Sequence, residues 1–294
     1  MFNHPIQEQL QKRILVIDGA MGTMLQAENL TYEDFGGEDL DGCNENLVLT
    51  RPDVLKKIHR AYLEAGADII CTNTFGGTPL VLNEYDLGHK ADAINTGAVK
   101  IAVEAAREFS TPEWPRFVAG AMGPTTKTLS VTGGISFEEL EENFYQQAKA
   151  LIEAGADLIL LETSQDMLNV KAGTIAVHRA FTELGKEIPV MISGTIEPMG
   201  TTLAGQSIEA FYISIEHIKP LSVGLNCATG PEFMTDHIRS LSDLATSYVS
   251  CYPNAGLPDE EGCYHETPDS LSKKLRGFAD KGWLNIVGGC CGTT

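Results

Sequence analysis

Three cysteines stand where two expected β-strands end. Cys227 closes an expected strand at 220–227, and Cys290 and Cys291 directly follow another at 284–289. In a barrel of parallel strands the functional groups come from the C-terminal strand ends, so these thiols should converge on one mouth. Three thiolates form a soft ligand set that suits Zn²⁺ and leave a fourth tetrahedral position open for a substrate. The sequence therefore predicts an open zinc site.

The adjacency of Cys290 and Cys291 leaves other interpretations open. Neighbouring side chains on a regular strand point to opposite faces, so both thiols reach one metal only if the backbone turns there. Three nearby glycines allow such a turn: Gly288, Gly289 and Gly292. The residues alone also allow a vicinal disulfide or two buried thiols. Four cysteines are expected to be packing residues: Cys43, Cys71, Cys251 and Cys263.

Two carboxylates also end expected strands. Asp18 follows the first strand, and Glu162 lies at the end of the fourth. In the mouth they would bind an ammonium group, while backbone N–H groups of the turn at 19–22 would bind a carboxylate, and together these describe an α-amino acid. Structural hydrogen bonding or helix capping is the alternative for the carboxylates. The glycines at 288–289 also lie where phosphate-binding barrels hold their ligand, although thiols follow them.

The elements that position these residues alternate along the chain. Eight short runs rich in β-branched residues read as strands: 14–18, 68–74, 116–121, 157–163, 189–195, 220–227, 248–253 and 284–289. Seven segments with helical periodicity separate them: 53–65, 88–109, 136–154, 166–184, 206–218, 231–245 and 267–282. This alternation favours a (β/α)₈ TIM-type barrel, with a doubly wound open sheet as the rival.

The domain boundaries follow from this pattern. Residues 1–13 are expected to be a lead-in segment and residues 14–294 a single barrel. No eighth helix follows the last expected strand before Thr294. We therefore expect a fragment of a longer multimodular chain, with the apolar surface of its first and last strands exposed.

Composition narrows the class of partner. The chain has 40 acidic and 21 basic residues, a net charge of -19, and no run of Lys and Arg. Nucleic acid and membrane surfaces are therefore not expected partners. The acidity is typical of a solvated surface, with an acidic face that docks another module as the alternative. The N-terminus has no signal peptide or apolar span, so a cytoplasmic location is expected.

Several motifs resemble those of the homocysteine S-methyltransferase family. They are Asp-Gly-Ala-Met-Gly-Thr-Met at 18–24, Thr-Asn-Thr-Phe at 72–75, Gly-Leu-Asn-Cys at 224–227 and Gly-Gly-Cys-Cys-Gly-Thr-Thr at 288–294. Two further stretches, at 44–49 and 252–258, are similar to the cobalamin-dependent methionine synthases within that family. The resemblance runs from about Ile14 to the last residue and implies a (β/α)₈ barrel.

The resemblance also implies roles for residues. The implied zinc ligands are Cys227, Cys290 and Cys291, with the homocysteine sulfur as the fourth. The implied substrate-binding residues are Asp18, Gly19, Ala20, Glu162 and Asn226. The two carboxylates would face the amino group, and the backbone amides at 19–20 would lie near the substrate carboxylate. No acid or base is assigned, because the metal activates the thiol.

The expected reaction is methyl transfer to the sulfur of L-homocysteine, which gives methionine. The resemblance implies methylcobalamin as the donor, recharged from 5-methyltetrahydrofolate and carried by a cobalamin-binding module in the same or another chain. Alternatives are a methyltransferase that uses betaine, S-methylmethionine or methylfolate directly, and a non-catalytic zinc- or thiol-binding barrel.

Overall fold

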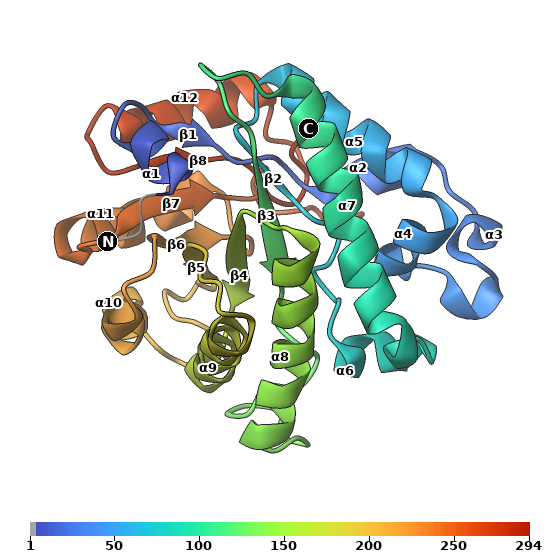
Figure 1. The fold of residues 1–294 in the computed structure, drawn as a ribbon. Helices are drawn as coiled ribbons and strands as arrows, with labels where there is room; N and C mark the ends of the chain where they lie inside the picture. The colour runs from blue at the N-terminus through green and yellow to red at the C-terminus, as the bar shows by residue number, and fades with distance from the viewer. Residues whose placement is uncertain (1–3) are drawn as a thin grey trace.

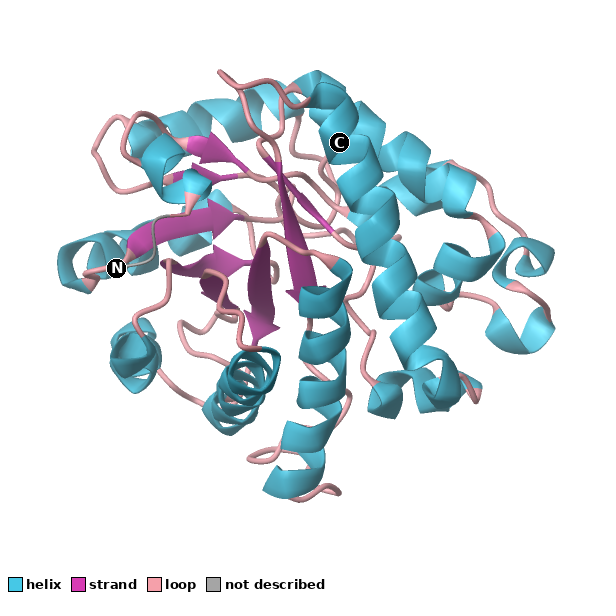
Figure 2. Ribbon diagram, in the orientation of Figure 1, coloured by secondary structure: helices cyan, strands magenta, loops and turns pink. Residues whose placement is uncertain are grey.

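The computed structural model describes residues 4–294, and its centre is one sheet of eight parallel strands (Figures 1 and 2). The strands are β1 Leu15–Val16, β2 Ile69–Cys71, β3 Phe117–Met122, β4 Leu158–Ser164, β5 Val190–Gly194, β6 Ser222–Asn226, β7 Tyr248–Tyr252 and β8 Ile286–Val287. Their spatial order is β1-β8-β7-β6-β5-β4-β3-β2, and a parallel bridge between Ile17 and Ile69 joins β1 to β2. The sheet is thus a nearly closed barrel, which confirms the (β/α)₈ prediction over the open sheet.

Helices alternate with the strands and cover the outside of the barrel (Figure 1). The long ones are α5 Pro52–Ala65, α7 Ala91–Phe109, α8 Phe137–Ala154, α9 Met167–Leu184, α10 Ile208–Ile215, α11 Pro231–Leu244 and α12 Pro268–Ala279. Ser136 and Glu139 form a capping box at the start of α8. Gly66 and Gly155 end α5 and α8 in the left-handed conformation, each within a Glu-Ala-Gly-Ala-Asp sequence, at 64–68 and 153–157.

Short helices fill segments where no element was expected. They are α1 Pro5–Leu10, α2 Met21–Ala27, α3 Tyr32–Phe35, α4 Leu47–Thr50 and α6 Pro79–Leu82, with 3-10 turns at Glu38–Leu40, Asn44–Asn46 and Asn83–Tyr85. Two more 3-10 turns, Gly88–Lys90 and Glu216–Ile218, lie inside the expected helical segments 88–109 and 206–218. Helix α1 lies in the expected lead-in segment. Its Ile6 and Leu10 are buried with Leu15, Phe117 and other residues from the beginnings of the strands. This segment therefore closes the N-terminal end of the barrel.

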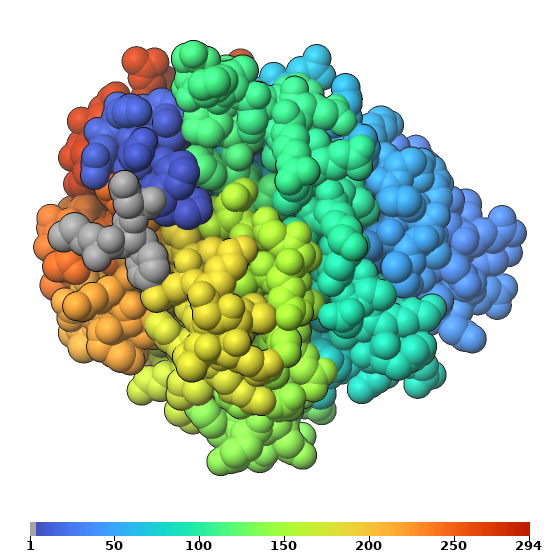
Figure 3. All heavy atoms as spheres, viewed as in Figure 1, coloured from blue at the N-terminus to red at the C-terminus, as the bar shows by residue number. Residues whose placement is uncertain are grey.

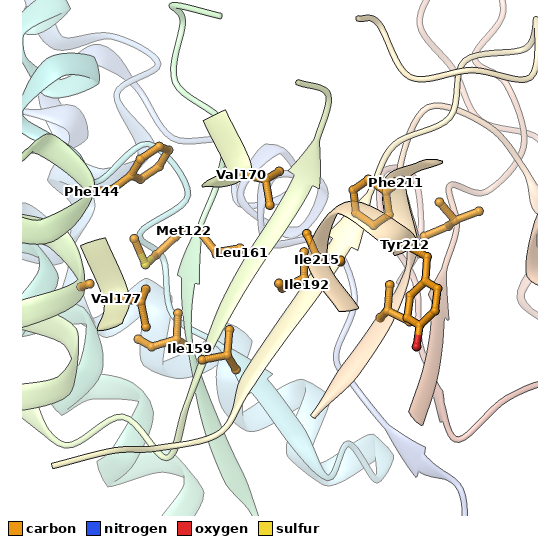
Figure 4. Close-up of a cluster of buried hydrophobic side chains, with 14 of the residues drawn as sticks. Met122, Phe144, Ile159, Leu161, Val170, Val177, Ile192, Phe211, Tyr212 and Ile215 are labelled. Atoms are coloured by element: carbon orange, nitrogen blue, oxygen red, sulfur yellow. The ribbon is translucent and has the colours of Figure 1, made fainter. Parts of the chain in front are cut away.

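The largest core lies between the sheet and the helices outside it. Figure 4 shows Leu161 and Ile192 of neighbouring strands facing side chains such as Val170 of α9 and Phe211 of α10. The residues that alternate with these along the strands, such as Leu160, point into the barrel and are equally buried. Burial on both faces explains why these strands read as continuous apolar runs.

The outside of the barrel between β8 and β1 is covered differently from the rest of the sheet. No helix follows β8 within residues 4–294, and a groove of about 600 Å³ lies there between α5 and α12. Its wall includes Val16, Leu271, Leu275 and Val287, and Val16 is 41% exposed. The N-terminal and C-terminal segments, blue and red in Figure 3, lie side by side at this part of the molecule. Exposed apolar surface was expected on the first and last strands: Val16 of β1 is exposed, whereas in β8 Ile286 is fully buried and Val287 is half-buried.

None of the helices in the described part of the chain combines the length and the apolar character needed to cross a membrane.

Candidate active site

Three thiols meet at the C-terminal mouth of the barrel. The sulfur atoms of Cys227, Cys290 and Cys291 all lie within 4.8 Å of one another, with Cys227–Cys291 at 3.8 Å and Cys290–Cys291 at 4.0 Å. A tetrahedral zinc ion with Zn–S bonds of about 2.3 Å places its sulfur ligands about 3.8 Å apart. All seven cysteines are unpaired, so the vicinal disulfide is not formed. The donor set fits a zinc ion with one position open.

Backbone turns bring the three thiols to one side. Cys227 adopts a left-handed conformation with φ of 61°, which takes the chain out of β6 immediately after Asn226. Strand β8 ends at Val287, so Cys290 and Cys291 lie in the turn that follows rather than on a strand. Gly292 has φ of 78°, and its N–H donates to the Thr23 hydroxyl at 2.9 Å. The expected turn is therefore present.

The thiols influence each other's protonation. Hydrogen bonding from Cys227 and Cys290 lowers the pKa of Cys291 to about 3. Hydrogen bonding with Cys227, and then with Cys291, raises the pKa of Cys290 well above its usual value. One sulfur of the cluster therefore carries negative charge at neutral pH, which favours a cation between the three.

The other cysteines lie apart from this cluster. Cys43 and Cys251 are fully buried, and the Cys251 sulfur packs against Met234. Cys263 is exposed. Cys71 differs from the packing role expected of it, because it lines the mouth and its N–H donates to the Asp18 carboxylate at 2.8 Å.

Three carboxyl groups line the pocket beside the thiols: those of Asp18 and Glu162, which the sequence predicts, and that of Glu45. The pocket has a volume of about 270 Å³, and its wall includes Asp18, Glu162 and the three clustered cysteines. Burial raises the pKa of Asp18 to about 7, against the opposing effect of hydrogen bonds from Cys71. Burial, followed by the charges of Asp18 and Cys227, raises the pKa of Glu162 to about 8. Among the described residues no Lys, Arg or His lines this pocket, so a positive charge beside the ionised carboxylates would have to come from a ligand.

Backbone N–H groups border the same pocket. Gly19, Ala20, Met21 and Gly22 line it, and α2 begins at Met21 with no side-chain hydrogen bond at its N-cap. The N–H groups of Gly19 and Ala20 have no acceptor among the described residues. A carboxylate can bind here without a basic side chain.

Asn226, an expected substrate contact, is engaged elsewhere. Its side-chain oxygen accepts from the Thr163 N–H at 2.9 Å, and its side-chain nitrogen donates to the Thr163 hydroxyl at 2.8 Å. Asn226 is fully buried, and the pocket wall is formed by Thr163 and Cys227 instead.

Sequence reasoning missed several residues of the pocket. Thr163, Tyr252 and Phe75 lie at or just beyond strand ends, where the rule used for Asp18 could have found them. Glu45 also lines the pocket, but it comes from a 3-10 turn between α3 and α4, far from any strand end.

Comparisons with known proteins identify the family and the fold. A sequence model of the homocysteine S-methyltransferase family matches residues 15–294. Crystal structures of the Escherichia coli homocysteine methyltransferase MmuM in oxidized and metallated forms share the fold, each with a TM-score of 0.81, 23% identity, and coverage of 99% of this chain and 96% of that chain. The apo form aligns over the same shares with a TM-score of 0.74 and 22% identity. Since the family match extends from β1 to the last residue and includes every cysteine of the cluster, the chain belongs to the homocysteine S-methyltransferase family.

Proposed function

We propose that this protein transfers a methyl group to the sulfur of L-homocysteine, giving methionine, and that Cys227, Cys290 and Cys291 hold a zinc ion for this reaction. One observation carries the proposal. Three thiols spaced as zinc ligands share a pocket with the buried carboxyl group of Asp18, the half-buried carboxyl group of Glu162 and backbone N–H groups that have no acceptor among the described residues. A thiol, an ammonium and a carboxylate are the three functional groups of homocysteine.

The chain's own residues bind and orient the substrate. Asp18 and Glu162 accept hydrogen bonds from the ammonium group, and its charge replaces the protons that burial holds on them. The N–H groups of Gly19 and Ala20 bind the carboxylate. With both ends of the amino acid held, the thiol is directed to the side of the pocket formed by the three cysteines.

Cys227, Cys290 and Cys291 would hold a zinc ion, which would lower the pKa of a thiol bound to it so that the sulfur would be a thiolate at neutral pH. Three cysteine thiolates would keep the formal charge of the ligand set negative and so leave electron density on the substrate sulfur. A sulfur lone pair forms the new S–C bond, and the donor keeps the electron pair of the bond that breaks. The thiol proton has already gone to solvent, so no side chain needs to act as a base.

For the donor we propose methylcobalamin, recharged from 5-methyltetrahydrofolate and carried by a separate cobalamin-binding module. The support is the similarity of residues 44–49 and 252–258 to cobalamin-dependent methionine synthases. Exposed apolar side chains on loops after β2 and β5, namely Phe75, Met199 and Leu203, suit contact with a large partner. Betaine, S-methylmethionine and methylfolate are the alternative donors, and methionine formation with each donor in turn distinguishes them.

The first test is the metal content of purified protein and of its Cys290→Ala variant, with the exposed Cys263→Ala as the control. We expect one equivalent of zinc in the unmodified and control proteins and its loss in Cys290→Ala. Homocysteine should then add a sulfur ligand to the metal and release a proton between pH 6 and 9. A metal-free protein with a Cys290–Cys291 disulfide would refute the proposal. Tight homocysteine binding without methionine from any donor would favour the non-catalytic thiol-binding barrel.

A further inference from the structure

Thr163 has a backbone conformation that its residue type disfavours. It follows Glu162 on β4 and adopts φ of 54°, in the left-handed region. For a β-branched residue this is a genuine outlier, because the side chain crowds the backbone there. The pairing of β4 with β5 is interrupted between Leu161 and Ser164, where Thr163 lies. Such a conformation persists only where its surroundings impose it, and it is typical of functional sites.

The Asn226 side chain is what imposes it. Both polar groups of the Asn226 side chain form hydrogen bonds with Thr163. The oxygen accepts from the Thr163 N–H at 2.9 Å, and the nitrogen donates to the Thr163 hydroxyl at 2.8 Å. Asn226 lies on β6, which is separated from β4 by β5, so this pair spans the sheet across a strand. The Thr195 hydroxyl, just beyond β5, donates to the Asn226 carbonyl at 2.9 Å. The ends of three strands are thereby joined behind the pocket.

The pair connects the two parts of the candidate site. Glu162 immediately precedes Thr163, and Cys227 immediately follows Asn226. Cys227 and Ala228 are themselves left-handed, with φ of 61° and 55°, so the chain turns sharply as soon as it leaves the Asn226 amide. A displacement of either partner would move a carboxylate on one side and a sulfur ligand on the other.

We infer that Thr163 and Asn226 are positioning residues that fix the distance between the ammonium-binding carboxylate of Glu162 and the sulfur of Cys227, and so set the preference for a thiol that bears an α-amino group. This rests on the proposed function, because it takes homocysteine as the ligand that spans the two groups. Neither residue needs to touch the metal or the sulfur. Their effect is geometric, through the backbone that they hold.

The test compares the binding of homocysteine with that of γ-mercaptobutyrate, which lacks only the amino group, to zinc-loaded protein. In the unmodified protein the amino group should contribute roughly 10- to 100-fold in affinity, as a hydrogen bond to a charged group does. Thr163→Val keeps the branched shape but removes the hydroxyl that Asn226 bonds. We expect the affinity ratio to fall by roughly tenfold or more, with one equivalent of zinc still bound. Thr163→Ser, which restores the hydroxyl, should recover the ratio.

Two further variants separate positioning from general stability. Thr174→Val removes a buried threonine hydroxyl on α9 that bonds the Lys171 carbonyl and does not line the pocket, and it should leave the affinity ratio unchanged. Thr163→Gly serves if the valine variant does not fold, because glycine adopts the left-handed conformation without strain. In this variant too, the affinity ratio of homocysteine to γ-mercaptobutyrate should fall.

The outcomes are distinct. An unchanged ratio in Thr163→Val or Thr163→Gly, or an equal loss of affinity for both thiols, overturns the inference and leaves the proposed function standing. Failure of the unmodified protein to bind either thiol at its zinc ion overturns the proposed function, and the inference with it.

Discussion

Replacing Glu162 with glutamine should remove a specific pH dependence from the stability of the protein. Burial raises the pKa of Glu162 from 4.5 to about 8, so the folded protein holds a proton there that the unfolded chain releases. Between these values the folded state binds more protons than the unfolded state, and the free energy of unfolding must fall as pH rises. Below pH 4.5 Glu162 is protonated in both states, so it no longer makes the free energy of unfolding depend on pH.

The magnitude follows from the size of this shift. Each pKa unit corresponds to about 1.4 kcal/mol, so the full shift corresponds to about 4–5 kcal/mol. Glutamine has nearly the shape of the protonated acid and does not titrate. We therefore expect Glu162→Gln to be close to the unmodified protein at pH 5 and more stable by up to about 4 kcal/mol at pH 9.

The assay is urea unfolding of both proteins, metal-free and reduced, at intervals from pH 5 to 9. Glu187→Gln, the same substitution at an exposed position, is the matched control. Parallel curves for Glu162→Gln and the unmodified protein would refute the argument that Glu162 is protonated when the pocket lacks a cation. Homocysteine should oppose the effect in the unmodified protein, because its ammonium group favours the ionised carboxylate.

Two further predictions concern the surroundings of the site. Gly292→Ala should destabilise the protein by about 1–3 kcal/mol and weaken zinc binding, because φ is 78° and a Cβ would lie 2.3 Å from the Tyr264 ring. Thermal melting and zinc titration measure these two effects. The control Gly277→Ala, whose Cβ would have no atom within 4 Å, should not destabilise the protein, and equal effects of the two substitutions would contradict the reasoning. Burial lowers the pKa of His59 from 6.5 to about 4, so between these pH values the unfolded chain binds a proton that the folded protein does not. The free energy of unfolding should therefore fall by about 3 kcal/mol as pH drops from 6.5 to 4. Urea unfolding of His59→Gln should show no such fall, and its persistence would show that another group is responsible.

Much of the fold could be predicted because its strands are buried on both faces. Runs such as Leu158 to Leu161 are apolar without interruption, and the turns between elements are marked by glycines such as Gly66 and Gly155. The short helices were missed because one or two turns are too brief for helical periodicity to emerge. The strands at the barrel's closing seam are the shortest, with Leu15–Val16 and Ile286–Val287 only two residues each.

The candidate site was predictable where residue type and strand position suffice. Cysteines and carboxylates at strand ends identify Cys227 and Glu162 without knowledge of their contacts. The role of Thr163 was not predictable in this way. It depends on a backbone conformation unusual for threonine and on a partner 63 residues away, on a strand that is not its neighbour. Asn226 was placed in the right region, but its side chain faces Thr163 rather than the pocket.

Charge links the two subsites of the pocket. Clustered thiols and carboxyl groups meet there, and within residues 4–294 no basic side chain lines the wall, in a chain whose net charge is already -19. Without ligands such groups remain neutral mainly by holding protons, as the raised pKa values of Asp18 and Glu162 indicate. A metal cation and a substrate ammonium would each displace some of these protons. Because the displaced protons compete with both ligands, zinc and homocysteine should bind more tightly as pH rises from 6 to 8, the range in which the ligand-free protein loses stability at Glu162.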